Sequence, residues 1–167
     1  MKQHLPPIIP PSIIGKYIQL ELLNDSHEQG LYEAAQHEAI WVISSSNAFG
    51  DKFAAYFQKA LTELQQKKQI PYVVRRLSDQ KILGSTRFYD IDESHKRLVI
   101  GYTWYMPEVW GTYVNRECKL LMLATAFEIW NINRVESHID SRNARSLAIS
   151  SACARIKFQD SMNHLHS

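Results

Sequence analysis

Hydrophobic and polar residues alternate along the chain with two different periods. Residues 17–22 alternate with period two, which is typical of a half-buried strand. Runs rich in β-branched and aromatic residues at 72–75, 82–89 and 97–105 are separated by turn residues, and they predict three consecutive antiparallel strands. Residues 134–139 predict a further strand. Because it follows a helix, this strand should run parallel to the 97–105 strand.

The helical period is clearest in the segment that Asp51 opens. Its apolar residues recur at intervals of three and four and form one stripe: Phe53, Phe57, Ala60, Leu61 and Leu64. An earlier helix is expected after the turn at residues 24–26, where Asp25 and Glu28 have the spacing of a capping box.

Two further helices are expected in the second half of the chain. One follows a loop at residues 107–112 and has Asn115 or a neighbour as its cap. Its apolar face is expected to hold Leu120, Leu123, Ala124 and Phe127. A shorter helix is expected after the turn at residues 140–143.

The order of these elements predicts the fold class and the domain organisation. The class is α+β, with a mixed, mostly antiparallel central sheet and helices on both faces. At 167 residues the chain is long enough for one core. We expect a proline-rich arm, or a first edge strand, at residues 1–16, one domain at 17–153 and an atypical tail at 154–167.

Composition and charge narrow the expected partners. Lys and Arg number 19 against 17 acids, a net charge of +2, which predicts no nucleic-acid or membrane surface. No apolar run is long enough to cross a bilayer, and the early prolines interrupt any signal sequence. Cys118 and Cys153 have no metal-type spacing, so we expect reduced thiols, a cytoplasmic protein and no metal.

Residues 104–117 form the most informative junction, where a strand leads into a helix. The first turn of a helix has unpaired N–H groups and the positive end of the helix dipole, which suit a phosphate. Many such junctions bind nothing. Neither a dinucleotide-binding fingerprint nor a P-loop motif is present, so the sequence supports neither a dinucleotide-binding fold nor a P-loop.

Several blocks, in the right order and with the right spacing, resemble the GNAT N-acetyltransferases. The blocks are residues 82–88, 101–105, 110–121, 126–128 and 140–146. They are most similar to the branch that acetylates ribosomal-protein N-termini (RimJ/RimL-like). The resemblance extends from residue 15 to residue 149, which is most of the chain.

This resemblance implies a site for acetyl-CoA between two parallel strands that splay apart, at 97–105 and 134–139. The pyrophosphate is expected at the loop before the third helix. The cofactor-binding residues that it implies are Trp104, Tyr105, Trp110, Gly111, Thr112, Val114, Asn115, Arg116, Asn143 and Ser146. Tyr113 and Asn115 depart from the family's loop pattern, which has small residues at both positions because of unusual dihedral angles.

The implied reaction is attack of a neutral amine on the thioester. A backbone N–H near Trp104 or Tyr105 is expected to stabilise the oxyanion. The catalytic residues are predicted to be Glu136, as the base, and Tyr105, as a proton donor to the thiolate. Glu136 could instead be a salt-bridged strand carboxylate, and Tyr105 a core residue. Weaker candidates are Tyr102, Glu117 and His138.

The last segment of the chain departs from the family. Relatives have two more strands after the fourth helix, whereas residues 150–167 have room for one at most, so the terminal strands are expected to be missing. An unfilled sheet edge predicts dimerisation, strand exchange or reduced activity.

The predicted function is transfer of an acetyl group from acetyl-CoA to a primary amine, either a protein N-terminus or a small molecule. The first alternative is a degenerate GNAT-fold module that binds CoA without turnover. The second is an interaction domain that has lost the cofactor.

Overall fold

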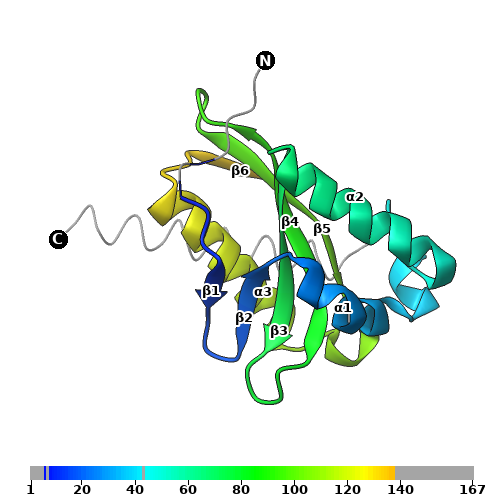
Figure 1. Cartoon of the computed structure of the whole chain (residues 1–167). Coiled ribbons are helices and arrows are strands. Elements are labelled where there is room, and N and C mark those ends of the chain that lie inside the picture. Colours follow the sequence, from blue (N-terminus) through cyan, green and yellow to red (C-terminus); the bar gives the residue numbers. More distant parts are fainter. Residues whose placement is uncertain (1–5, 7, 43, 138–167) are drawn as a thin grey trace.

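The described residues form a six-stranded sheet, with the strands in sequence order (Figure 1). The computed structural model describes residues 6, 8–42 and 44–137. The strands are β1 (Ser12–Ile14), β2 (Ile18–Leu22), β3 (Gln69–Arg76), β4 (Ile82–Asp92), β5 (Arg97–Tyr105) and β6 (Arg134–Glu136). Neighbours from β1 to β5 are antiparallel, and β6 is parallel to β5. The predicted mixed, mostly antiparallel sheet is therefore confirmed.

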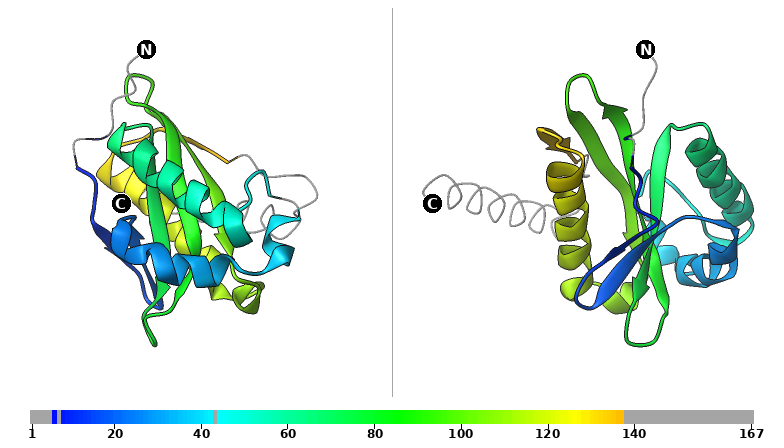
Figure 2. Two further views of the ribbon diagram at one scale, coloured as in Figure 1. Left: turned by 45° about the vertical axis from the view of Figure 1, so that its right-hand side comes forward. Right: turned by 60° about the vertical axis from the view of Figure 1, so that its left-hand side comes forward.

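Helices cover both faces of this sheet (Figure 2). On one face lie α1 (Glu28–Ala35) and α2 (Phe53–Gln65), and on the other lies α3 (Tyr113–Ala124). A short 3-10 turn precedes each helix: η1 (Asp25–His27) before α1, η3 (Gly50–Lys52) before α2 and η4 (Pro107–Val109) before α3. A further 3-10 turn, η2 (Glu38–Trp41), follows α1. A π-helical turn, η5 (Thr125–Ile129), extends α3.

Each face of the sheet has its own core. The core on the α3 face contains Tyr72 and Phe88 from the sheet and Met122 from α3. The core on the other face joins α1 and α2 to the sheet through Phe57 and Trp104. Because successive strand residues point to opposite faces, a strand that is covered on both sides needs apolar residues at consecutive positions.

The structure confirms most of the predicted stripe of α2 and corrects that of α3. In α2, Phe53, Phe57 and Ala60 are buried as expected, whereas Leu61 and Leu64 are half-buried. In α3 the buried positions are Val114, Cys118, Lys119 and Met122, whereas all four predicted residues, Leu120, Leu123, Ala124 and Phe127, are only half-buried. This helix is apolar on more than one side, so its period does not identify the face that meets the sheet.

Two helix caps also differ from the predictions. The capping box before α1 is formed by Asn24 and His27 rather than by Asp25 and Glu28, because a 3-10 turn precedes the α-helix. The cap of α3 is Thr112, whose side chain accepts the N–H of Val114, and Asn115 lies within the helix.

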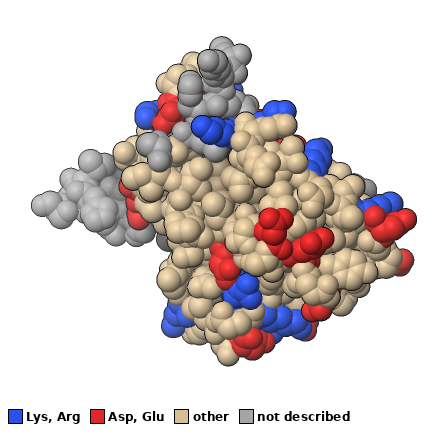
Figure 3. All heavy atoms as spheres, viewed as in Figure 1, with Lys and Arg blue, Asp and Glu red and all other residues tan. Residues whose placement is uncertain are grey.

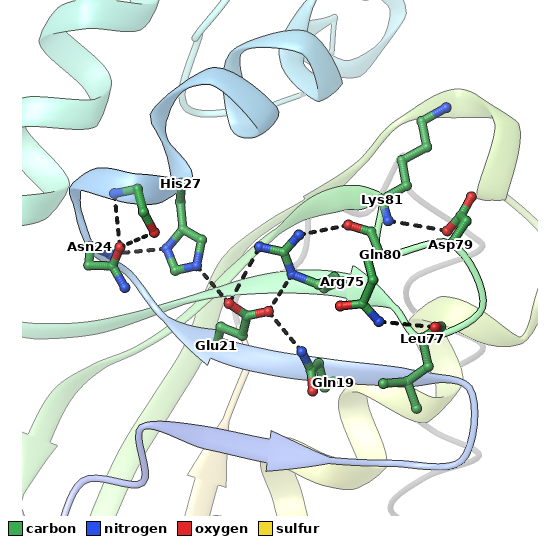
Figure 4. Close-up of polar contacts among 10 residues, drawn as sticks. Gln19, Glu21, Asn24, His27, Arg75, Leu77, Asp79, Gln80 and Lys81 are labelled. Carbon is green, nitrogen blue, oxygen red and sulfur yellow. Dashed lines mark hydrogen bonds and ion pairs between the residues drawn. The ribbon is translucent and has the colours of Figure 1, made fainter.

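The junction of β2 and α1 is held by a network of polar groups around the buried His27 (Figure 4). Nδ1 of His27 accepts the backbone N–H of Asn24, so its Nε2–H donates to Glu21 at 2.9 Å. Glu21 also accepts hydrogen bonds from Arg75 on β3 and from Gln19. Burial alone would raise the pKa of Glu21, but the hydrogen bonds from Arg75, His27 and Gln19 lower it to about 2.

Both signs of charge occur on the face shown in Figure 3, without a large patch of one sign. Within the described residues, no helix is long and apolar enough to cross a bilayer. The end of the predicted 134–139 strand, the fourth helix, the residues Asn143 and Ser146, and the tail at 154–167 lie outside the described residues. The proposed division into arm, domain and tail stays a prediction. Within the arm, residues 12–14 form β1 and belong to the sheet.

Candidate functional site

A β-bulge in β5 is the most distinctive backbone feature of the sheet. Gly101 is paired with Arg87 and Trp104 with Ser85, so two residues of β5 lie opposite one residue of β4. One of the two, Tyr102, has φ of 52°, a left-handed conformation that is rare for a bulky residue. The bulge bends β5 between its pairing with β6 and its C-terminal end.

Gly84 on β4 permits the close approach of the two strands beyond the bulge. A Cβ at this position would overlap the carbonyl oxygen of Trp104 and lie 2.9 Å from the Cα of Tyr105. No side chain larger than hydrogen fits here without moving β5. Gly84 lies within a block that resembles the family, but its contact with β5 could not be found from its own neighbours in the sequence.

The residues after the bulge point to opposite faces of the sheet. Trp104 packs on the α1 and α2 side, where its indole N–H donates to the Tyr56 hydroxyl at 2.9 Å and its ring lies 5.1 Å from that of Trp41. Tyr105 belongs to the core on the α3 side. The two predicted site residues therefore link β5 to both layers of helices.

Tyr105 also connects β5 to the start of α3. Its hydroxyl donates to Oδ1 of Asn115 at 3.0 Å, and its carbonyl accepts the indole N–H of Trp110 at 2.8 Å. Burial leaves Tyr105 7% exposed. The structure thus brings together three residues that the resemblance assigns to the acetyl-CoA site.

The loop before α3 has one residue that needs glycine. Gly111 has φ of 73°, and a Cβ there would meet no atom within 4 Å. Glycine is therefore needed at this position for its backbone conformation and not for lack of space. Tyr113 and Asn115 lie inside α3 and have negative φ. Their departure from the family's loop pattern therefore introduces no backbone strain.

The first turn of α3 contains the remaining predicted residues of this loop. Thr112 caps the helix, and its hydroxyl also donates to the carbonyl of Val109 at 2.6 Å. Val114 is buried in the core, whereas the Arg116 side chain is exposed. The first N–H groups of a helix have no intrahelical partner, and Thr112 occupies one of them.

Glu136 lies at a distance from Tyr105. In the parallel register it pairs with Val99, six residues before Tyr105, which is roughly 20 Å along an extended strand. Its carboxylate is 2.9 Å from the Arg134 guanidinium. The structure therefore does not bring the two predicted catalytic residues together, and it gives Glu136 the salt-bridged position that was its structural alternative.

The weaker candidate Glu117 has a structural contact. Its carboxylate accepts the backbone N–H groups of Lys16 and Tyr17, which lie in the turn between β1 and β2. This contact fastens the β1–β2 hairpin to α3. Tyr102 is 39% exposed, and His138 lies outside the described residues.

The pairing of β5 with β6 covers three residue pairs in the described part of the chain. It extends from Arg97 and Arg134 to Val99 and Glu136, and β5 continues for six residues beyond it. No group of three or more possible metal ligands occurs among the described residues.

Comparison with known proteins identifies the family. The family model described as "Acetyltransferase (GNAT) domain" matches residues 18–154, which is most of the chain. The chain therefore belongs to the GNAT family of acetyltransferases, whose members use acetyl-CoA as acyl donor. No protein with a curated description matches the sequence.

Solved structures of acetyltransferases share the fold. A Chromobacterium violaceum protein assigned to the GNAT family is 29% identical, with a TM-score of 0.72, and the match covers 90% of this chain and 75% of that one. A T. thermophilus protein assigned as an acetyltransferase is 23% identical, with a TM-score of 0.73 and coverage of 87% and 75%. The ribosomal-protein-S5-alanine acetyltransferase of Vibrio fischeri is 17% identical, with a TM-score of 0.66 and coverage of 85% and 81%.

Proposed function

We propose that this protein transfers an acetyl group from acetyl-CoA to a primary amine, and that the amine is a protein N-terminus. The observation that carries the proposal is the bulged end of β5, where Tyr105 contacts both the loop before α3 and its first turn. The thioester arm lies along this part of β5, and the diphosphate lies at the N-terminus of α3 near Gly111 and Arg116.

The backbone amide of Tyr105 is the proposed oxyanion donor. The N–H of Met106 donates to the carbonyl of Leu83 on β4, and successive amides of a strand point to opposite edges. The amide of Tyr105 therefore points away from β4, toward the edge on which β6 lies. An N–H group in this place can donate to the thioester carbonyl as negative charge develops on its oxygen.

The side chain of Tyr105 is the proposed proton donor to the departing thiolate. We expect Tyr105→Phe to lower kcat by roughly 10- to 100-fold, because general-acid catalysis contributes about that much or more. The acetyl-CoA dissociation constant should change little. Initial rates and isothermal titration measure both quantities. Full turnover by Tyr105→Phe would show that the hydroxyl is not the proton donor and only forms the hydrogen bond with Asn115.

Glu136 is the predicted base, but its position beside Val99 lies too far from Tyr105 for proton transfer directly or through one water. We therefore expect Glu136→Gln and Arg134→Gln, which both remove the ion pair, to have equal and small effects on kcat. A loss of turnover confined to Glu136→Gln, with unchanged affinity for acetyl-CoA, would restore Glu136 as the base.

The predicted base, Glu136, lies far from Tyr105, and this distance favours an acceptor that needs little deprotonation, such as an α-amine. An α-amino group has a pKa of about 7.7–8.0 and a lysine side chain of about 10.4, so at pH 7.5 roughly a third of α-amines are neutral, against about 0.1% of lysines. An acceptor that is already partly neutral needs little help with deprotonation. This argument favours a protein N-terminus over a polyamine.

Thiol release with a panel of amines tests the function. We expect release of CoA with short peptides that have an unmodified N-terminus, and none with the same peptides N-acetylated beforehand. Spermidine and single amino acids complete the panel. Heat on titration with acetyl-CoA without turnover of any amine would support the CoA-binding module instead. Absence of both would reject both functions.

The unusual loop residues and the shortened tail would both favour a binding module without turnover, and the first of these two arguments is weakened by the geometry of the loop. The unusual residues Tyr113 and Asn115 lie in regular helix and leave the loop conformation to Gly111. Its other argument, the shortened tail, concerns residues outside the described part of the chain.

A further inference from the structure

A buried arginine lies beside the bulge of β5. Arg87 is on β4, and its side chain is 5% exposed. Its Nη1 donates to Oε1 of Gln69 at 2.7 Å and lies 3.4 Å from Oε2 of Glu63. Its Nε has no hydrogen-bond partner in the described part of the chain. Because a buried charge is costly unless it is well paired, this guanidinium requires further stabilisation.

Two tyrosine rings supply that stabilisation. The guanidinium carbon lies 5.2 Å from the ring centroid of Tyr56, on α2, and 5.0 Å from that of Tyr102, in the bulge. Both distances are within the range of cation–π contact, and a planar guanidinium suits contact with aromatic faces. Arg87 therefore connects the bulge of β5 to α2.

Side-chain contacts link Tyr102 to Arg87, Arg87 to Tyr56 and Tyr56 to Trp104, and the backbone of β5 joins Trp104 to Tyr102. We name these four residues the bulge clamp. Arg87 pairs with Gly101, immediately before the strained Tyr102. Tyr56 contacts Arg87 through its ring and accepts the indole N–H of Trp104 through its hydroxyl. Residues on both sides of the bulge are thus fastened to one helix.

We propose that Arg87 is a positioning residue that holds the bulge so that the amide of Tyr105 faces the thioester. This inference rests on the proposed acetyl transfer. A non-glycine residue in the left-handed region persists only where its surroundings hold it. Without the clamp, Tyr102 can relax toward negative φ, and the orientation of each later amide in β5 changes with it.

Tyr102→Gly separates positioning from stability. Glycine accepts the positive φ without strain but removes the ring from the guanidinium. We expect the thermal midpoint to stay the same or rise, while kcat falls by roughly 10- to 100-fold, the size of effect that small misplacements of reacting groups produce. The acetyl-CoA dissociation constant should stay within about twofold of the wild-type value, because the loop before α3 is untouched.

Conservative and matched variants complete the kinetic test. Tyr102→Phe keeps the ring and should recover most of the turnover that Tyr102→Gly loses. Arg87→Met should lower kcat as Tyr102→Gly does. Arg75→Met is the matched control, because it removes a partly buried arginine whose hydrogen bonds go to Glu21 and Gln80 rather than to the clamp. This control should lower stability but leave kcat per folded molecule unchanged.

Hydrogen exchange gives a readout that does not need turnover. Amides in residues 100–106 should exchange roughly tenfold faster in Arg87→Met than in the wild type, while those of β2, which Arg87 does not contact, should not differ. Equal exchange rates in the wild type and Arg87→Met would overturn the proposed role of Arg87, whatever the turnover of the two proteins. Activity that merely follows stability across the variants would overturn it as well. A wild type without turnover but with the exchange difference would reject the proposed function and keep the clamp.

Discussion

Single residues decide the backbone geometry of the site. Gly111 supplies a positive φ before α3, Gly84 allows β4 and β5 to approach each other, and Tyr102 takes a left-handed conformation although it is not glycine. The first two are cases in which the absence of a side chain is required. The third is held by contacts with its neighbours, which is why it is the better candidate for a functional constraint.

Gly84→Ala tests the close approach of the two strands. The new methyl group overlaps the carbonyl of Trp104, so β5 must shift. We expect a loss of about 1–3 kcal/mol in the free energy of unfolding, as for other overpacked sites, together with a lower kcat. Urea unfolding and initial rates measure the two effects. Gly30→Ala is the control, because its methyl group would meet the movable end of the Ile82 side chain. Equal effects of both substitutions would contradict this account.

At the scale of secondary-structure elements, the sequence predicts the buried face of a helix well when only one side of the helix is apolar. It predicts that face less well when two sides are apolar. The stripe of α2 identified its buried face, since its other side is polar. In α3, Leu120 and Met122 are both apolar, and only contact with the sheet distinguishes them. The cap of α3 was also misplaced, because Thr112 and Asn115 are both good capping residues.

Met122→Ala and Leu120→Ala test which face of α3 meets the sheet. Met122 is 0% exposed and belongs to the core, so its truncation should cost about 2–5 kcal/mol. Leu120 is half-buried and should cost about 1 kcal/mol or less. Chemical denaturation monitored by circular dichroism gives both values. A larger loss for Leu120→Ala would restore the face that the sequence predicts.

At the scale of the whole molecule, the described residues form a sheet between two layers of helices, and the proposed site lies where β5 meets both layers. Trp104 packs against one layer and Tyr105 against the other. The sheet ends at β6 in the described part of the chain. The homodimer that an unfilled edge would favour stays a prediction, which sedimentation velocity can test.

The acid dependence of stability is a property of the whole molecule, because Glu21 joins β2, β3 and the start of α1. Its pKa is about 2 in the folded protein and near 4.5 in the unfolded chain. The lower folded value means that the group stabilises the fold above pH 4.5, and that this contribution is lost as the pH falls from 4.5 toward 2. Allowing for partial exposure, we expect about 2 kcal/mol.

Urea unfolding of the wild type and Glu21→Gln between about pH 7 and pH 2.5 measures this contribution. The difference between the two proteins should be largest near neutral pH and should shrink as the pH approaches 2. A difference that stays constant over this range would show that Glu21 acts through packing and not through its charge.

The sequence by itself determined the order of the elements along the chain, the main part of the apolar stripe of α2, the parallel last strand and the family resemblance. These features depend on local periodicity and on residues that are close in the chain. The tertiary structure decided the face of α3, the bulge in β5, the burial of Arg87 beside it and the separation of Glu136 from Tyr105. Each of these depends on which residues of two distant segments face each other. A one-residue change in register between strands alters that pairing while leaving the period of each strand unchanged.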